Sequence, residues 1–310
     1  MRIKKVLVPV DFSPPSTLAV NHGVALARKF RATLSLIHVV ESSSAPLYIF
    51  PAESDKVEAQ RQDQAEKMLP LLVSDEDQDD LDVKFIVRAG DVEDVIHAVA
   101  GEEHADVVVM GTHGRGLFGR LFIGSVTQAL LRKLGVPVLT VCRVSRPLDF
   151  KRILFATDFG PDSDKGFQIA LDIAAETRAA LTVAHAIDKR PGMTYETPEV
   201  QELFDEQRTE ALKEAHDKFA QFKMKATRRD VSVKCVLAEG EAAETLVRIA
   251  DETEADFIVL GLRNKGAMSR ALLGSTAEPV IRAAHVPVLS VPIDKKVAVE
   301  LGAKEVQHAF

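Results

Sequence analysis

Apolar residues form short, unbroken runs along the chain, and the stretches between these runs have the spacing of amphipathic helices. Runs rich in Val, Ile and Leu with little alternation are typical of strands buried on both faces of a sheet. In the first half such runs lie at 3–10, 33–40, 83–88, 105–110 and 136–142, and helical stretches lie at 16–30, 54–73, 91–102 and 124–134. Strands that alternate with helices predict right-handed crossovers and a parallel, doubly wound sheet of the α/β class.

The same order of segments occurs twice in the chain. KKVLVPVDFSPPS, which starts at Lys4, recurs as KRILFATDFGPDS from Lys151. ADVVVMGTHGRG, which starts at Ala105, recurs as ADFIVLGLRNKG from Ala255. Each copy is long enough to form its own core, so the pattern indicates a tandem duplication and not a solenoid. We expect one domain at 1–145, a second at 149–294 and a C-terminal tail at 295–310.

The composition is that of a globular protein with an acidic balance. Hydrophobic residues make up 46% of the 310 residues, charged residues make up 27%, and the formal net charge is -7. No block of Lys or Arg is dense enough to follow a phosphate backbone, which argues against nucleic acid as a partner. No segment approaches the ~18 consecutive apolar residues of a membrane span, so we expect a cytoplasmic protein without a membrane partner.

The cysteines and two histidines indicate no chemistry of their own. Cys142 and Cys235 each lie in a strand-like run, a pattern that predicts reduced, buried thiols and not a disulfide or a metal site. His38 and His185 occupy equivalent positions of the two copies, inside apolar strands. We interpret both histidines as structural residues, with metal binding or acid–base work as the alternative.

Two sets of glycines overlap between Gly111 and Ser125. The narrow set, Gly114 to Gly119, spells the dinucleotide motif G-x-G-x-x-G, but this motif belongs after a first strand and before an acidic residue. Here it follows the fourth strand, and the second copy keeps only one of its three glycines. The wider set is repeated, because Gly111, Gly124 and Ser125 recur as Gly261, Gly274 and Ser275.

The wider set combines a strand end, a loop and a helix start, which is the arrangement of a phosphate-binding loop. At Gly111 the missing side chain would let a ligand approach the backbone, and Gly124 with Ser125 would open a helix whose N–H groups face phosphate oxygens. The alternative is that the glycines only shape a turn and that Ser125 only caps its helix.

The chain resembles the universal stress proteins, whose nucleotide-binding signature is G, two residues, G, nine residues, G, then S or T. Gly111, Gly114, Gly124 and Ser125 match this signature in full, and VLVPVDFS, IHVV and GVPVLTV also resemble the family. The resemblance covers both copies. It implies two Rossmann- or flavodoxin-like sheets with strand order 3-2-1-4-5, and ATP bound at the carboxyl ends of the strands. Carried over by position, the first site would consist of Pro9, Val10, Asp11, Val39, Met110, Gly111, Gly114, Gly124, Ser125 and Val126.

The second copy departs from the signature at one position, where Asn264 replaces the glycine. Asn tolerates left-handed backbone angles, but its side chain enters space that the phosphates would need. The second site is therefore the weaker expectation. Its residues would be Ala156, Thr157, Asp158, Ala186, Leu260, Gly261, Asn264, Gly274, Ser275 and Thr276.

Two classes of function remain open. The resemblance implies a stress-response binding module that takes ATP, with Mg²⁺ entering only together with the nucleotide. The alternative is a slow ATP hydrolase, or a scaffold in which one domain alone binds nucleotide. The chain has no Walker loop and no carboxylate pair placed for a metal, and Asp11, which could instead cap the next helix, is the acidic residue of the inferred site.

The last apolar run of each copy, Val136–Val141 and Val286–Val291, would lie at the edge of its sheet. An apolar edge strand of this kind is a liability unless it is paired. Related proteins pair this strand antiparallel with that of a second domain. We therefore expect the two domains to pair within one chain about a pseudo-two-fold axis, which leaves open a homodimer of whole chains.

Overall fold

The computed structural model describes residues 2–41, 51–112, 123–142, 145, 148–160, 163–187, 198–262 and 273–292, apart from the side chains of 51–55 and 198–207. The first half contains β1 (Lys5–Pro9), α1 (Pro14–Phe30), β2 (Thr33–Glu41), α2 (Pro51–Met68), η1 (Pro70–Leu72), α3 (Asp75–Asp80), β3 (Val83–Gly90), α4 (Val92–Glu102), β4 (Val107–Gly111), α5 (Ser125–Lys133) and β5 (Val138–Val141). The second half contains β6 (Arg152–Ala156), α6 (Ser163–Thr177), β7 (Ala180–Ile187), α7 (Pro198–Thr227), β8 (Val233–Glu239), α8 (Ala242–Glu252), β9 (Phe257–Leu262), α9 (Ala277–Ala283) and β10 (Val288–Pro292).

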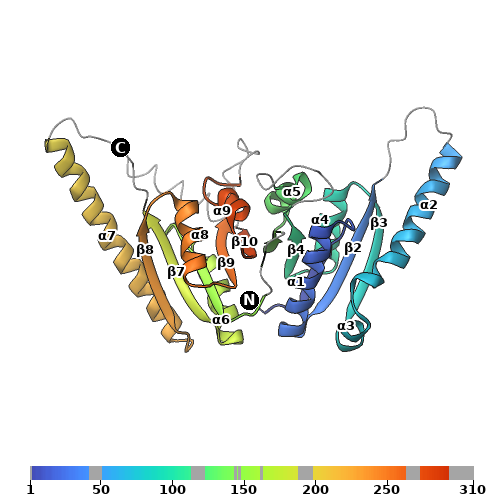
Figure 1. The fold of residues 1–310 in the computed structure, drawn as a ribbon, viewed down its shortest axis with the longest axis horizontal. Coiled ribbons are helices and arrows are strands. Elements are labelled where there is room, and N and C mark those ends of the chain that lie inside the picture. The colour runs from blue at the N-terminus through green and yellow to red at the C-terminus, as the bar shows by residue number, and fades with distance from the viewer. Residues whose placement is uncertain are drawn as a thin grey trace.

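The strands of both halves form one ten-stranded sheet in the order β3-β2-β1-β4-β5-β10-β9-β6-β7-β8 (Figure 1). Each half therefore has the predicted order 3-2-1-4-5, with parallel neighbours throughout. The halves join through the antiparallel pair of β5 and β10, in which Leu139 lies opposite Leu289. The last strands, which would be edges in isolated domains, are interior strands here.

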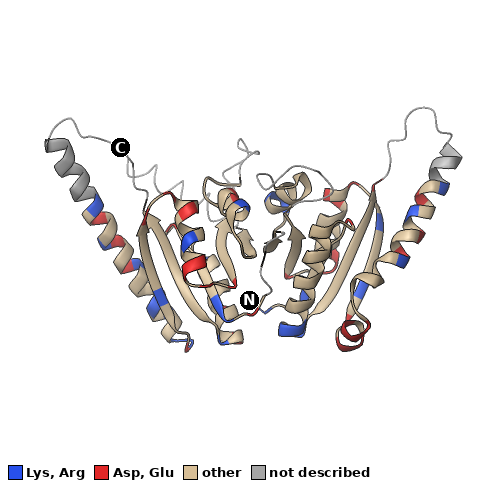
Figure 2. Cartoon of the chain, in the orientation of Figure 1, with Lys and Arg blue, Asp and Glu red and all other residues tan. Residues whose placement is uncertain are grey.

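Charged residues are concentrated on the helices at the two ends of the sheet. Figure 2 shows Lys, Arg, Asp and Glu alternating along α2 and α7, while the strands between them are mostly uncharged. Two apolar cores lie on opposite faces of the sheet, and each contains residues of both halves. At the junction, the Phe150 ring centroid lies 5.5 Å from that of Phe30 and 6.0 Å from that of Phe257, so aromatic packing supports the strand pairing.

The second helix of the first half is shorter than the predicted range 54–73. It ends at Met68, and the chain continues through η1 and α3 to the start of β3. Pro70 explains the break, because proline has no N–H for the helical hydrogen bond to residue 66. In the second half α7 has no proline after Pro198 and continues without a break to Thr227. The two halves therefore present different surfaces to the solvent at these helices.

The predicted burial of the two cysteines is wrong. Both thiols are free and half-buried, because Cys142 follows the end of β5 and Cys235 lies on β8 at the outer edge of the sheet. Burial against its neighbours nevertheless raises the pKa of Cys235, with an opposing contribution from Lys223. A raised thiol pKa lowers the thiolate population of Cys235 at neutral pH.

Candidate functional site

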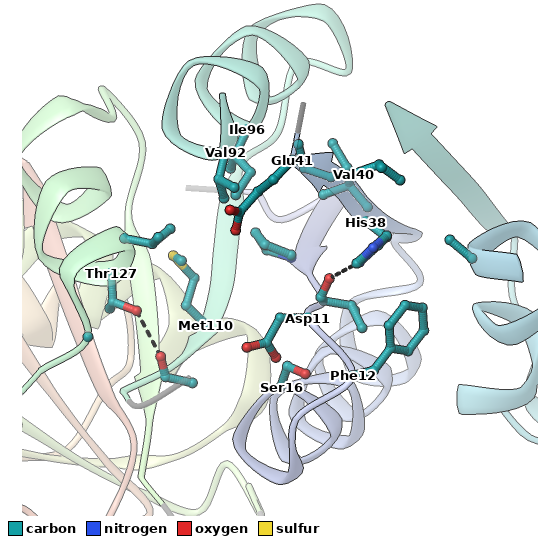
Figure 3. Close-up of a pocket in the computed structure, with 18 of the residues that line it drawn as sticks. Asp11, Phe12, Ser16, His38, Val40, Glu41, Val92, Ile96, Met110 and Thr127 are labelled. Carbon is teal, nitrogen blue, oxygen red and sulfur yellow. Dashed lines mark hydrogen bonds between the residues drawn. The ribbon is translucent and has the colours of Figure 1, made fainter. Parts of the chain in front are cut away.

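A cavity of about 1150 Å³ lies at the carboxyl ends of β1, β2 and β4, where the order of the strands changes direction. Nine of the ten residues predicted for the first site line this cavity, and Gly114 lies outside the described residues. The strand ends contribute backbone and short side chains, α5 contributes its first turn, and α4 contributes apolar side chains (Figure 3). The lining residues from the predicted set are Pro9, Val10, Asp11, Val39, Met110, Gly111, Gly124, Ser125 and Val126.

The turn from β1 to α1 places Asp11 in the cavity wall. Asp11 Oδ1 accepts hydrogen bonds from the N–H of Ser13, at 3.0 Å, and from its hydroxyl. Ser13 in turn caps α1, since its side chain accepts from the N–H of Ser16. Asp11 thus orders the residue that begins the helix, which is close to the alternative role expected from the sequence, and it also lines the cavity. The two roles are compatible because a carboxylate has two oxygens.

The turn from β4 to α5 is closed by hydrogen bonds across its base. Thr127 Oγ1 donates to the carbonyl of Gly111 at 2.9 Å, and the N–H of Gly124 donates to the carbonyl of Thr112 at 2.7 Å. The N–H of Thr112 donates to the carbonyl of Val141 on the neighbouring strand. The start of α5 is therefore held beside the end of β4, whatever the sequence between them.

Gly111 has a packing role in addition to its predicted place in the site. A Cβ atom at this position would lie 2.9 Å from the backbone of Pro15 at the start of α1. Such a contact is shorter than side-chain packing allows, and backbone atoms cannot rotate away. Gly111 is therefore required for the close packing of α1 on β4, and the sequence motif alone did not reveal this neighbour.

The N-terminus of α5 faces the cavity without a side-chain cap. Gly124 is the N-cap residue, and among the described residues no side chain accepts a hydrogen bond from the first turn. Ser125 is the first helical residue and is exposed, so the alternative that it caps the helix is wrong. The backbone N–H groups and the positive end of the helix dipole are consequently directed at the space where an anion would bind.

His38 has the structural role expected for it and also lines the cavity. Its Nδ1 donates a hydrogen bond to the carbonyl of Val10 at 2.7 Å, and its ring centroid lies 4.6 Å from that of Phe12 (Figure 3). The second half repeats this arrangement, with His185 Nδ1 bonded to the carbonyl of Thr157 and the ring 4.2 Å from Phe159. Each histidine therefore ties the end of the first strand to the second strand.

Several lining residues were not predicted from the sequence. They belong to the β1–α1 turn, α1, α2, α4, α5 and the end of β2, where nothing in the local pattern separates a cavity residue from a surface residue. These residues are Phe12, Ser16, Glu41, Arg61, Gln64, Ala65, Met68, Val92, Ile96 and Thr127. Position in an alternating strand could have placed Glu41 beside Val39, because residues two apart in a strand share a face.

The second half differs at the helix that should contact phosphate. Gly274 and Ser275 do not open this helix, because α9 begins two residues later, at Ala277. Pro279 explains the difference, since it has no N–H to donate to the carbonyl of Ser275. The first helical bond runs instead from the N–H of Val280 to the carbonyl of Thr276. Gly274 has φ +101°, whereas Gly124 has φ -56°, so the backbones also differ.

The remaining residues predicted for the second site lie at equivalent strand ends. Ala156, Thr157 and Leu260 are buried, Asp158 is exposed, and Asn264 lies outside the described residues. Asp158 Oδ1 accepts from the N–H of Gly160 and from the hydroxyl of Ser163, as Asp11 does from Ser13. A cavity of about 570 Å³ in the second half lies between α8 and α9 instead, and no predicted residue lines it.

Within the described part of the chain, no group of three or more His, Cys, Asp or Glu side chains is placed to hold a metal ion. Likewise, no helix in these ranges is long and apolar enough to cross a membrane.

A sequence model of the universal stress protein family matches residues 2–141 and 149–292, one segment in each half of the sheet. The chain belongs to the universal stress protein family. Over 151 residues it is 34% identical to a universal stress protein of Methanocaldococcus jannaschii, which covers 47% of this chain and 85% of the relative. Over 141 residues it is 34% identical to universal stress protein G of Escherichia coli O157:H7, which covers 44% of this chain and 98% of the relative.

A solved structure shows that the universal stress protein fold extends over both halves. The crystal structure of a universal stress protein from Archaeoglobus fulgidus covers 94% of this chain and 97% of its own, with a TM-score of 0.65 at 22% identity. At this identity the similarity establishes the fold. The ligand of this universal stress protein has to be argued from its own cavity.

Proposed function

We propose that the first half binds ATP in the cavity at the carboxyl ends of its strands, and that the chain acts as a nucleotide-responsive binding module in the stress response. The observation that carries the proposal is that the uncapped N-terminus of α5 and nine residues of the predicted site meet in one cavity. A helix N-terminus supplies N–H donors and a positive potential, which suit phosphate oxygens.

The other end of the cavity suits a nucleoside. Val39 and Met110 are buried apolar residues, and Asp11 offers a carboxylate that accepts hydrogen bonds from ribose hydroxyls or from an exocyclic amine. An apolar slot with a few placed polar groups is the usual form of a small-molecule site. Mg²⁺, where it accompanies the nucleotide, would meet oxygen ligands from Asp11 and Ser125, a donor set that hard cations accept.

The second half is proposed to bind nucleotide more weakly. Its helix α9 begins two residues after the position that aligns with Ser125, and Asn264 stands where the signature has glycine. The later helix start removes N–H donors from the phosphate end of the site, and the side chain of Asn264 would reduce the space there.

Hydrolysis of ATP is the second candidate function, and we propose that it is slow. The carboxylates that line the cavity are Asp11 and Glu41, and Asp11 already accepts two hydrogen bonds from Ser13. A dedicated hydrolase orients its attacking water with a separate residue and holds the phosphates with a Lys or Arg. Turnover near the ordinary enzyme range of about 1–1000 per second, abolished in Asp11→Asn, would reverse this ranking.

The proposal is tested by calorimetric titration of ATP into the full chain and its Gly124→Val variant. Valine at Gly124 adds an isopropyl group at the N-terminus of α5, so we expect at least a tenfold loss of affinity with an unchanged melting temperature. Gly135→Val is the matched control, since Gly135 is exposed and a Cβ there meets no atom within 4 Å. Equal affinity in Gly124→Val and wild type would show that the site is wrongly placed.

A further inference from the structure

The cavity extends past the proposed nucleotide site to the side of the sheet that α2 covers. We call this part the α2 lobe and define it by Phe12, His38, Val40, Arg61, Ala65 and Met68, all of which line the cavity. Small-molecule pockets usually measure about 300–1000 Å³. The whole cavity, at about 1150 Å³, is larger than this range.

The charges of the cavity divide between its two sides. Glu41 points toward Val92 and Ile96 of α4, whereas Phe12 and His38 lie on the opposite side, which faces α2 (Figure 3). On the α2 side the charged group is Arg61, which is exposed and has no carboxylate within ion-pair distance among the described residues. The α2 lobe therefore joins an apolar floor to one positive charge.

The floor of the α2 lobe is formed by two rings in contact, one of which is held by a hydrogen bond. Phe12 has φ 60°, a left-handed conformation that is rare for a bulky residue, and its ring lies against that of His38. The hydrogen bond from His38 Nδ1 to the carbonyl of Val10 fixes the ring orientation and, in the neutral imidazole, leaves Nε2 as an acceptor. A ligand would meet a preformed aromatic surface and lose little affinity to reorganisation.

The second half has the same aromatic pair but fills the space above it. Phe159, with φ 56°, stacks on His185, and the centroids of Phe219 and Phe222 on α7 lie 5.2 and 6.3 Å from that of Phe159. When the sequences of the two halves are aligned so that β3 matches β8, Leu69 and Leu72 align with Phe219 and Phe222. In the same alignment Arg61 aligns with Ala211. At these aligned positions the first half therefore has two smaller side chains in place of phenylalanine rings, and a positively charged side chain in place of alanine.

We propose that the α2 lobe binds a second small molecule with an aromatic or apolar body and an acidic group, beside the nucleotide. The ring of such a ligand packs against Phe12, His38 and Met68, and its anion meets the Arg61 guanidinium. Simultaneous binding of ATP and of this second ligand rests on the proposed ATP site. Binding of the second ligand in the α2 lobe alone does not.

The first test uses two fluorescent probes of similar shape, anionic 1-anilinonaphthalene-8-sulfonate and neutral N-phenyl-1-naphthylamine, titrated into the full chain. Arg61→Ala, which installs the residue of the second half, should weaken the sulfonate about threefold to fivefold and leave the neutral probe unchanged. Lys67→Ala is the control, because Lys67 lies on the same helix, pairs with Asp63 and does not line the cavity. Equal losses in the two variants would overturn the assignment.

The second test locates the sulfonate probe. The chain has no tryptophan, so Met68→Trp introduces a single donor for energy transfer to the probe. Met224→Trp is the matched control, an exposed methionine on α7 in the other half. We expect strong transfer from position 68 and weak transfer from position 224. Equal transfer from both positions would place the probe elsewhere and refute the proposal.

The third measurement separates the α2 lobe from the nucleotide site. The sulfonate titration is repeated with and without saturating ATP. Retention of the probe at full ATP occupancy supports two compartments, and stoichiometric displacement would show that the probe had occupied the nucleotide site and overturn the proposal. A chain that binds the probe at position 68 but binds no ATP would support the α2 lobe and refute the proposed function, so the two failures are distinguishable.

Discussion

Leu139 and Leu289 lie directly opposite each other in the antiparallel pair of β5 and β10. They occupy equivalent positions of the two halves, so the pseudo-two-fold axis of the sheet passes between them. Both side chains are buried, at 2% and 4% exposure. The strand pair thus converts two apolar edges into the centre of one sheet.

We predict that this pairing holds the halves together in solution. Leu139→Glu with Leu289→Glu places two like charges face to face in an apolar core, which should cost at least ~3 kcal/mol of unfolding free energy or separate the halves. Small-angle scattering and urea unfolding measure the two outcomes. Leu71→Glu is the control, since Leu71 is 81% exposed. Scattering from the wild type that fits two independent domains on a flexible linker would contradict the arrangement.

We predict that each chain binds one ATP tightly. The second half lacks the early helix start because Pro279 cannot donate to Ser275, and it lacks the glycine at Asn264. Calorimetry should give a stoichiometry near one for the wild type. Pro279→Ala with Asn264→Gly restores the missing N–H and the glycine, and should add a second, weaker binding event. Two equal tight sites in the wild type would show that the differences have no effect.

We predict that burial of His22 makes stability depend on pH. His22 is 3% exposed on α1, and burial lowers its pKa from 6.5 to about 4. The unfolded chain therefore takes up a proton below pH 6.5 that the folded chain does not, so stability falls between pH 6.5 and 4, by up to about 3 kcal/mol. His22→Leu, which mimics Ile169 at the equivalent position of the second half, should remove this contribution. Urea midpoints at pH 7, 6 and 5 compare the two proteins, and parallel slopes would contradict the prediction.

We predict that two equivalent hydroxyl groups at the junction contribute unequally. Thr140 Oγ1 donates to the carbonyl of Val288 at 3.1 Å, whereas the buried Oγ of Ser290 has no hydrogen-bond partner within the described structure. Thr140→Val should therefore lower the unfolding free energy by about 1 kcal/mol, because a hydrogen bond is lost. Ser290→Ala should leave it unchanged or raise it, since an unsatisfied hydroxyl is removed. Urea unfolding measures both variants, and a larger loss in Ser290→Ala would refute the account.

The sequence by itself determined the α/β class and the duplication, and its resemblance to the universal stress proteins implied the order of strands in each half. Uninterrupted apolar runs identified strands buried on both faces, and the match of Asp11 with Asp158 set the two copies in register. The break of the helix at Pro70 and the late start of α9 at Pro279 were not predicted, although both have a local cause, because a missing N–H acts within four residues of the proline. These signals are local in the chain.

Only the tertiary structure decided which of these residues face one another. That Gly111 packs on Pro15, that α5 begins at the cavity and that Phe12 and His38 line the same cavity all depend on segments distant in sequence. The α2 lobe in particular is lined by residues of β2, of α2 and of the turn before α1, which are distant from one another in the sequence. A cavity is a space bounded by several elements whose side chains do not fill it. The hydrophobic periodicity of one element does not indicate which side chains the opposing elements place there.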